Sequence, residues 1–451
     1  MTDPSVPIQA GRIRPRERDT IVASLRAGMV PRVGQQHIQV GRAAEVRAAI
    51  RDIDHLTDGG AGCRFVIGEY GSGKTFFLQL VRSIALERRL VTVHADLSPD
   101  RRLHAASGQA RSLYAELMRN LATRSRPDGG ALASVVERFV TGALNEANAA
   151  GDDPADTIKS RLVELADLTG GYDFAAVIGA YWRGYDTGDE RLRADAVRWL
   201  RGEFTSRVDA RAALGVRTIV DDATVYDHLK LMARFVRLAG FTGLLVCLDE
   251  MVNLYKITGS AVRNANYEQV LRIVNDTTQG SAEHLGFLFG GTPEFLLDPR
   301  RGLFSYPALA SRLAPNRFAV PDRVDHSGPV LRLGNLAPED IFVLLTRLRH
   351  VYAGGDPARY LVPDEALTAY MAHCAARIGD AYFRTPRETI RGFLDLLALL
   401  EQHPDLHWSA LIGSVDLSTP ANPDLTLDPS GPPAGAGPTT VDDDELTAFR
   451  L

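Results

Sequence analysis

Residues 68–75 of the sequence, GEYGSGKT, have the composition and spacing of a loop that holds phosphate groups. They match the P-loop pattern G-x-x-x-x-G-K-[ST], in which glycines let backbone N–H groups converge on phosphate oxygens. Lys74 is placed to reach the β- and γ-phosphates, and the Thr75 hydroxyl to bind Mg²⁺. A chance match in a glycine-rich loop is the alternative. The pattern predicts that ATP and Mg²⁺ bind here, with contacts from Gly68, Glu69, Tyr70, Gly71, Ser72, Gly73, Lys74, Thr75 and Phe76.

An acidic motif lies far downstream, at residues 243–250, which read GLLVCLDE. An apolar run that ends in Asp-Glu is the Walker B pattern of a buried strand. We expect Asp249 to hold Mg²⁺ through water and Glu250 to polarise the water that attacks the γ-phosphate. The alternative is a core strand with an acidic end. The motif follows Thr75 by 174 positions (249 − 75), which disfavours compact nucleotide kinases and small GTPases.

Three further residues occupy positions suited to contact with a γ-phosphate. Thr292 ends an apolar run, 284–291, where a strand between the P-loop and Walker B strands would place a sensor. Arg312 follows at a helix end, where an arginine finger would stabilise charge in a neighbouring subunit's site, with Arg317 as the second choice. Arg387 opens a C-terminal helix as a second sensor. The alternatives are a turn threonine, a surface arginine paired to a carboxylate, and a helix-start ion pair.

The segments around these motifs predict an α/β fold with a parallel sheet. The apolar run 65–67, the helix beginning at Phe76 and the apolar run 90–95 form one β-α-β unit, and such units have parallel strands. A VGR turn containing Gly41 and Arg42 precedes this unit. We expect these two residues to lie beside the adenine base.

Composition and periodicity divide the chain into four parts. Residues 414–451 carry seven acidic side chains against one arginine, with no apolar periodicity, so we expect a disordered acidic tail. The predicted parts are an N-terminal helical segment (1–60), a P-loop core (61–333) with a large helical insertion between Walker A and Walker B (126–215), a C-terminal helical lid (334–413) and the tail (414–451).

The overall composition excludes several classes of protein. With 451 residues, 45% hydrophobic, and a net charge of −5, the chain is long enough for two or three globular domains and is not a uniformly basic nucleic-acid binder. The three cysteines are far apart, which argues against a disulfide framework or a zinc site. Neither a signal peptide nor a membrane-spanning run is visible, so we expect a cytoplasmic protein that makes no membrane contact.

Several stretches resemble the BrxD-like ATP-binding proteins of the BREX phage-defence family, which are AAA+ ATPases related to the Orc/Cdc6 initiator clade. The resemblance is carried by residues 37–55, 64–86, 94–105, 114–132, 244–256, 264–280, 285–313 and 383–394. It implies an AAA+ fold, ATP binding with hydrolysis, and action beside a superfamily 2 helicase in anti-phage or anti-plasmid defence.

Two functions are compatible with these residues. The first is an AAA+ ATPase that couples ATP hydrolysis to DNA or to a partner helicase, as a homo-oligomer with shared sites. The second is a slow-turnover, nucleotide-gated switch or scaffold for a defence complex. Direct DNA contact has weak support from the arginines between residues 300 and 349, because dispersed surface arginines are the commoner explanation.

Overall fold

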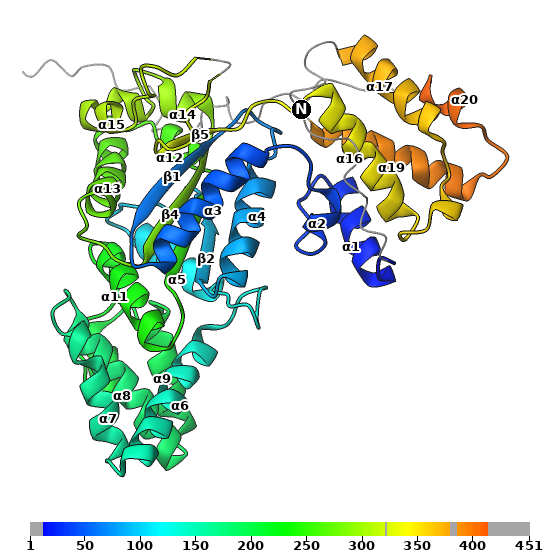
Figure 1. Cartoon of the computed structure of the whole chain (residues 1–451). Helices are drawn as coiled ribbons and strands as arrows, with labels where there is room; N and C mark the ends of the chain where they lie inside the picture. The colour runs from blue at the N-terminus through cyan, green and yellow to red at the C-terminus, as the bar shows by residue number, and fades with distance from the viewer. Residues whose placement is uncertain (1–11, 321–322, 379–385, 414–451) are drawn as a thin grey trace, which may run out of the picture.

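The computed structural model describes residues 12–320, 323–378 and 386–413. Its centre is a five-stranded sheet in the order β2-β3-β4-β1-β5, and all pairings are parallel (Figure 1). The strands are β1 (Gly62–Ile67), β2 (Val91–Asp96), β3 (Leu244–Asp249), β4 (Leu285–Gly291) and β5 (Val330–Arg332). The predicted α/β class and parallel sheet are confirmed, and the strand before Thr292 lies between the P-loop and Walker B strands.

The strands are buried because both faces of the sheet are covered by helices, as parallel sheets require. On one face α3 (Ala43–Thr57) and α4 (Lys74–Glu87) form an apolar layer with side chains from β1, β3 and β4. On the other face lie α5 (Gln109–Arg119), α11 (Val225–Leu238) and α13 (Ser260–Thr278). In Figure 1 these helices flank the sheet at the centre of the larger lobe.

Aromatic packing joins the central strands on the second face. The rings of Phe65 on β1 and Phe289 on β4 stack with their centres 4.7 Å apart, and Phe287 lies 5.8 Å from Phe289. All three side chains are almost fully buried. Stacked aromatic pairs contribute about 0.5–1.5 kcal/mol beyond the burial of their area, so this cluster fixes the P-loop strand against its neighbour.

Five helices occupy the segment predicted as a helical insertion and extend away from the sheet (Figure 1). Their apolar core is continuous with the sheet's second face, where Phe174 packs edge-on against Phe235 of α11. Asp173 accepts backbone hydrogen bonds from Arg217 and Thr218 and so ties the segment to the chain leading back to the core. The helices are α6 (Leu132–Ala150), α7 (Pro154–Leu162), α8 (Gly171–Thr187), α9 (Glu190–Leu200) and α10 (Arg207–Leu214).

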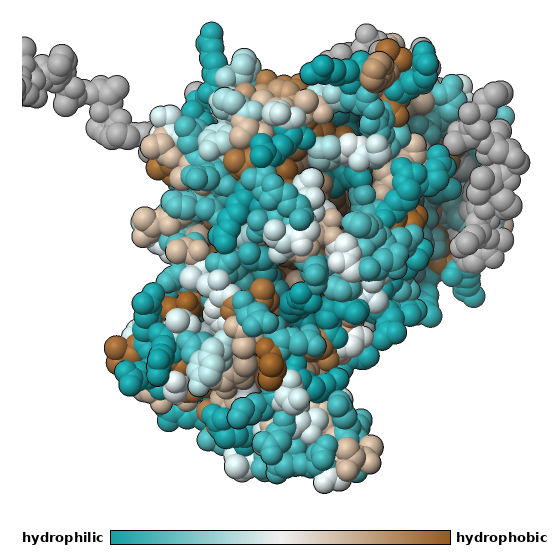
Figure 2. Space-filling model, turned by 60° about the vertical axis from the view of Figure 1, so that its left-hand side comes forward, coloured by the Kyte–Doolittle hydropathy of each residue, from teal (hydrophilic) through white to brown (hydrophobic). Residues whose placement is uncertain are grey.

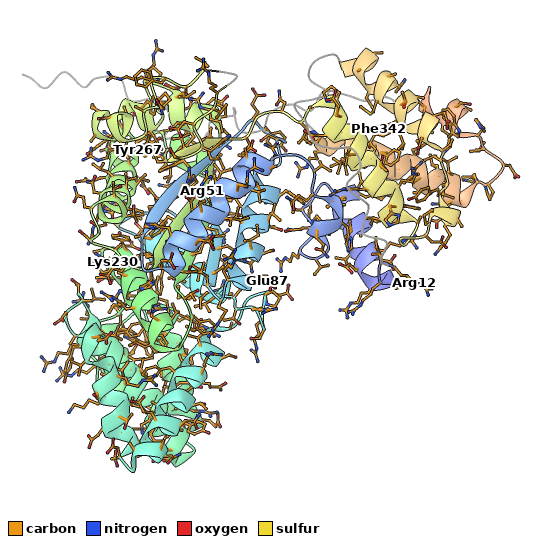
Figure 3. All side chains as sticks on the ribbon, in the orientation of Figure 1. Arg12, Arg51, Glu87, Lys230, Tyr267 and Phe342 are labelled. Carbon is orange, nitrogen blue, oxygen red and sulfur yellow. The ribbon has the colours of Figure 1, made fainter. Side chains whose placement is uncertain are left out.

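A second, smaller lobe is built from both ends of the described chain (Figure 1). It combines the C-terminal helices α16 (Pro338–Tyr352), α17 (Asp364–Ile378), α19 (Pro386–Gln402) and α20 (Trp408–Ile412) with α1 (Pro15–Arg26) and α2 (Gln35–Ile38). Figure 3 labels Arg12 and Phe342 in this helical lobe, and Arg51 and Glu87 in the sheet lobe. Residues 12–60 are thus divided between the two lobes, because α1 and α2 pack on the C-terminal helices while α3 packs on the sheet.

Contacts between α1 and the C-terminal helices are both apolar and polar. Ile21 and Leu25 enter the same buried cluster as Leu394. The guanidinium of Arg26 donates to Asp395 at 2.9 Å. These contacts span more than 360 residues of sequence, which is why periodicity alone did not predict them.

Short helices complete the sheet lobe near the strand ends: α12 (Val252–Tyr255), α14 (Pro293–Leu297) and α15 (Pro307–Arg312). The 3-10 turns are Val163–Leu165, Leu303–Ser305 and Pro357–Arg359. Within the described ranges, no helix is long and apolar enough to cross a membrane. The face in Figure 2 is mainly hydrophilic, with hydrophobic residues scattered in small groups. The predicted acidic tail lies outside the described residues.

Candidate nucleotide-binding site

The P-loop joins the end of β1 to the start of α4. Gly71 and Gly73 have φ values of +77° and +87°, a backbone region that favours glycine. Gly73 is the residue before the first turn of α4, whose N-terminal N–H groups attract anions. The ammonium of Lys74 donates to the carbonyls of Gly68 and Glu69, each at 2.9 Å. The loop therefore has the backbone shape that phosphate binding needs.

The Walker B strand brings its carboxylate to the same loop. The Thr75 hydroxyl donates to Asp249 Oδ2 at 2.7 Å, across the 174 positions that separate them. Asp249 is buried, at 8% exposure, and its other oxygen accepts a hydrogen bond from the backbone N–H of Glu250 at 2.9 Å. Hydroxyl and carboxylate oxygens are ligands that Mg²⁺ prefers, so the residues fit a magnesium ion.

Glu250 has an unusual backbone conformation, with φ of +56°. Its carbonyl accepts hydrogen bonds from the backbone N–H of Asn253 at 3.0 Å and from the Asn253 side chain at 3.3 Å. A non-glycine residue in this region costs on the order of 1–3 kcal/mol and persists only where its surroundings enforce it. The fold thus constrains the direction of a carboxylate that lines the P-loop cavity.

A cavity lies between the two lobes and ends at the P-loop. Its polar end is formed by P-loop residues and Glu250. Its apolar end is formed by residues of both lobes and of the chain between α1 and α3: Leu25, Met29, Val30, Ile38, Val40, Phe76, Leu80, Leu336, Leu344 and Ile390. This distribution suits a ligand with a flat apolar base at one end and phosphates at the other.

The Gly41–Arg42 turn lies between the P-loop and the helical lobe. The Arg42 guanidinium donates to the Ser72 carbonyl at 2.7 Å. Burial lowers the pKa of Arg42, while Glu45 and Asp340 oppose the shift. Gly41 has φ of +60°, and a Cβ there would come within 2.9 Å of the Asp340 carboxylate. Arg42 lines the cavity and contacts the loop backbone; the neighbouring Gln39 and Val40, which the sequence analysis missed, line it too.

Arg387, at the start of α19, reaches the P-loop from the helical lobe. Its Nη1 donates to the Tyr70 hydroxyl at 2.8 Å, and its Nε donates to the Gly28 carbonyl at 2.8 Å. The structure therefore brings Arg387 to the phosphate-binding loop.

Thr292 and Arg312 lie elsewhere. Thr292 is buried at the end of β4, and its hydroxyl accepts a hydrogen bond from the Phe295 backbone N–H as the cap of α14. Arg312 donates to Asn275 at 2.6 Å and borders a separate cavity of about 540 Å³ beside the starts of β1 and β4. Neither residue lines the P-loop cavity, so their roles as sensor and arginine finger stay predictions.

Asp96 is an acidic residue near the site that the sequence analysis did not assign. It ends β2 in register with Asp249 on β3. Loss of hydration at this strand end and the negative charge of Asp249 raise the pKa of Asp96, and Arg101 opposes the shift. The available signal was the acidic end of a predicted buried strand next to the Walker B strand.

The parallel sheet, the glycine-rich loop between β1 and α4, and the Thr75–Asp249 contact together define a P-loop nucleotide-binding protein. A family model described as BREX system ATP-binding protein BrxC/D matches residues 13–416, and the chain belongs to that family. No curated protein matches the chain. The predicted resemblance is confirmed, and membership supports ATP binding and a role in the BREX phage-defence system.

Proposed function

We propose that the protein is an AAA+ ATPase that hydrolyses ATP and couples the reaction to DNA or to a partner helicase in anti-phage and anti-plasmid defence. The observation that carries the proposal is the Thr75–Asp249 hydrogen bond. It joins the two motifs that a hydrolytic site needs, with Glu250 following directly and lining the same cavity.

The chemistry follows from what each side chain presents. Thr75 and Asp249 would hold Mg²⁺, which supplies charge neutralisation to the phosphates. Lys74 and Arg387 provide cationic donors for the phosphate oxygens, while the carboxylate of Glu250 orients the attacking water and accepts its proton. Positioning and charge stabilisation account for most of the catalysis of phosphoryl transfer. The residues of this cavity would provide both.

The domain organisation belongs to the same proposal. We assign residues 126–215 as a helical insertion in the ATPase core, 334–413 as the lid, and 1–60 as the segment leading into the core. In a homo-oligomer, Arg312 would act as an arginine finger on the neighbouring subunit, and Thr292 as a sensor. We place the protein in the cytoplasm, with other defence-system proteins as partners.

Contact with DNA has one local candidate. Two arginines of the strip between residues 300 and 349 make contacts within the protein: the buried Arg349 donates to Asp364, and the half-buried Arg301 donates to the Tyr255 carbonyl. Arg317 instead directly precedes Phe318, whose side chain is 91% exposed, and the exposed Arg323 follows five positions later. Basic side chains beside an exposed aromatic ring suit single-stranded nucleic acid, through phosphate contacts and base stacking.

A slow-turnover switch is the second candidate, and one observation favours it. The two cationic side chains that we assign to the phosphates donate to protein acceptors: Lys74 to loop carbonyls and Arg387 to Tyr70 and Gly28. Engaging a triphosphate requires these contacts to rearrange, which would make nucleotide-dependent closure slower than chemistry.

ATP turnover by wild type and Glu250→Gln separates the two candidates. Each protein is assayed alone, with single-stranded DNA and with double-stranded DNA, and the oligomer mass is measured with and without ATP. DNA-stimulated turnover that Glu250→Gln abolishes, together with ATP-dependent assembly, supports the ATPase. Tight ATP binding with negligible turnover under every condition defeats it and favours the switch.

A further inference from the structure

Tyr70 is the P-loop residue that meets the helical lobe. Its hydroxyl accepts the hydrogen bond from Arg387 Nη1, and the Arg387 guanidinium carbon lies 5.8 Å from the centre of its ring. The same guanidinium donates to the Gly28 carbonyl through Nε and Nη2. All three residues line the P-loop cavity. Three segments that are far apart in the sequence therefore meet at one guanidinium.

The Tyr70 contact uses a nitrogen that Arg387 would offer to a phosphate. A guanidinium has five N–H groups and no acceptor, and three of them, one on each nitrogen of Arg387, donate to Tyr70 or Gly28. Tyr70 and Gly28 are neutral acceptors, whereas a phosphate oxygen is charged and forms hydrogen bonds roughly twice as strong. A phosphate that forms two hydrogen bonds with Nη1 and Nη2, on the edge of the guanidinium that Gly28 leaves open, therefore competes with Tyr70 for Nη1.

Of the two groups that accept hydrogen bonds from Arg387, one belongs to the backbone and the other to a side chain, so only the second can be removed by substitution. Gly28 accepts through its backbone carbonyl at φ of +70°, and a Cβ there would lie 3.0 Å from Arg387 Nε. That acceptor is fixed by the fold and cannot be removed without disturbing the turn. The Tyr70 hydroxyl can be removed alone, because phenylalanine keeps the ring and its contact with the guanidinium.

We propose that Tyr70 sets the preference of the site for ATP over ADP, because its hydroxyl competes with the γ-phosphate for Arg387. The inference rests on the proposed role of Arg387 as a γ-phosphate contact. ADP has no γ-phosphate, so it binds without drawing Arg387 away from Tyr70. The hydroxyl thus lowers the affinity for ATP and leaves the affinity for ADP unchanged. Tyr70 is a specificity-determining residue that acts through Arg387.

The test measures dissociation constants for Mg·ATP and Mg·ADP by calorimetry in the full chain, with Glu250→Gln as the background that limits turnover. We expect Tyr70→Phe to bind ATP about three- to tenfold more tightly, the range that one net hydrogen bond provides. ADP affinity stays the same. Tyr172→Phe, at a side chain 78% exposed in the segment 126–215, is the matched control and changes neither constant.

A second pair of variants ties the effect to Arg387. In an Arg387→Ala background, adding Tyr70→Phe leaves ATP affinity unchanged, because no guanidinium remains to be shared. The proposal is overturned if Tyr70→Phe weakens ATP binding, leaves it unchanged, or shifts ATP and ADP equally. It is also overturned if the gain persists without Arg387.

These outcomes are distinct from failure of the proposed function. A wild type that binds no ATP, or a Glu250→Gln variant that turns ATP over like the wild type, defeats the proposed ATPase itself. If both of those results support hydrolysis and Tyr70→Phe has no effect, only the role of Tyr70 is wrong.

Discussion

The two sides of the P-loop cavity are built in different ways. On the sheet side, buried strands place Thr75, Asp249 and Glu250 through contacts inside one packed core. On the helical side, Arg387 is placed by a lobe that the two ends of the chain assemble together. The sheet side thus takes its groups from the core of the sheet, whereas the helical side has a separate apolar core of its own. In the proposed function, nucleotide binding depends on the sheet side of the cavity, and the discrimination between ATP and ADP depends on the helical side.

The largest expected effect comes from truncating one buried side chain in the apolar core of each lobe. Phe289 and Leu394 are both fully buried, one in β4 and the other in α19. Phe289→Ala should cost about 3–5 kcal/mol and Leu394→Ala about 2–5 kcal/mol, from lost burial and the cavity left behind. We expect Phe289→Ala to abolish ATP binding, and Leu394→Ala to leave the sheet lobe folded with ATP bound more weakly.

Thermal unfolding measures the stability of these two variants, and hydrogen exchange measures the protection of each lobe separately. Phe318→Ala and Leu399→Ala are the matched controls, because their side chains are 91% and 44% exposed, and each should change stability by less than about 0.5 kcal/mol. Equal loss of protection in both lobes after Leu394→Ala would show that the lobes are not separate units, and the comparison would fail.

The next effect tests the sheet side alone. Lys74 is the P-loop cation, and Lys74→Ala removes a charge-assisted contact to the phosphates worth about 1.5–3 kcal/mol. We expect ATP and ADP affinity to fall by about 10- to 100-fold, with the stability of the protein unchanged. Calorimetric titration of both nucleotides measures this. A loss confined to ATP would assign Lys74 to the γ-phosphate and overturn the division of roles with Arg387.

A pH effect is also expected on the sheet side. Burial, helped by Arg82 and Arg32, lowers the pKa of His94 on β2 to about 4, from 6.5 in the unfolded chain. Between about pH 4 and pH 6.5, His94 therefore binds a proton in the unfolded chain but not in the folded protein. Above pH 6.5 the protonation of His94 does not affect the free energy of unfolding. As the pH drops from about 6.5 to about 4, the free energy of unfolding decreases by up to about 3 kcal/mol.

Urea unfolding of wild type and His94→Gln across this pH range isolates the His94 contribution as the difference between the two curves. We expect the variant to lose less stability on acidification than the wild type. His403→Gln, at an exposed position in the helical lobe, serves as the control and should keep the wild-type slope. Parallel curves for wild type and His94→Gln would contradict the assignment.

The sheet side was largely predictable from sequence, because local patterns encode it. A strand, a glycine-rich loop and a helix are consecutive in the chain, and the apolar run before Asp249 marks a second buried strand. Parallel strands end at one edge of a sheet, so the predicted partners Thr75 and Asp249 had to converge. The contact observed between them follows from that geometry.

The helical side was less predictable, because its contacts are long-range and have no periodicity. Nothing in the residues around Gly28 indicated a carbonyl acceptor for Arg387, 359 positions away. The pairing of α1 with α19 likewise depends on which apolar faces meet after folding, so the division at residue 60 did not anticipate it. Arg387 itself was expected from its place at a helix start, but its acceptors were not.

The smallest expected effect compares one ion pair on each side. Arg26–Asp395 joins α1 to α19 at 2.9 Å, and Arg88–Asp54 joins the end of α4 to α3 at 2.7 Å. All four side chains are between 43% and 51% exposed, so each pair is worth less than about 1 kcal/mol and weakens at about 1 M salt. Similar stability losses are expected for Arg26→Ala and Arg88→Ala.

ATP affinity should separate these two variants even though stability does not. Arg26 lies two residues before Gly28, and its partner lies on the helix that carries Arg387, so Arg26→Ala loosens the placement of that guanidinium and changes ATP affinity by a factor of about two to three. Arg88→Ala has no such route to the cavity and should leave ATP affinity unchanged. Calorimetry at low and high salt measures both. If Arg88→Ala shifts ATP affinity as much as Arg26→Ala, then the sheet side is as deformable as the helical side. Discrimination between nucleotides would then have to be explained by the cavity as a whole and not by the helical lobe.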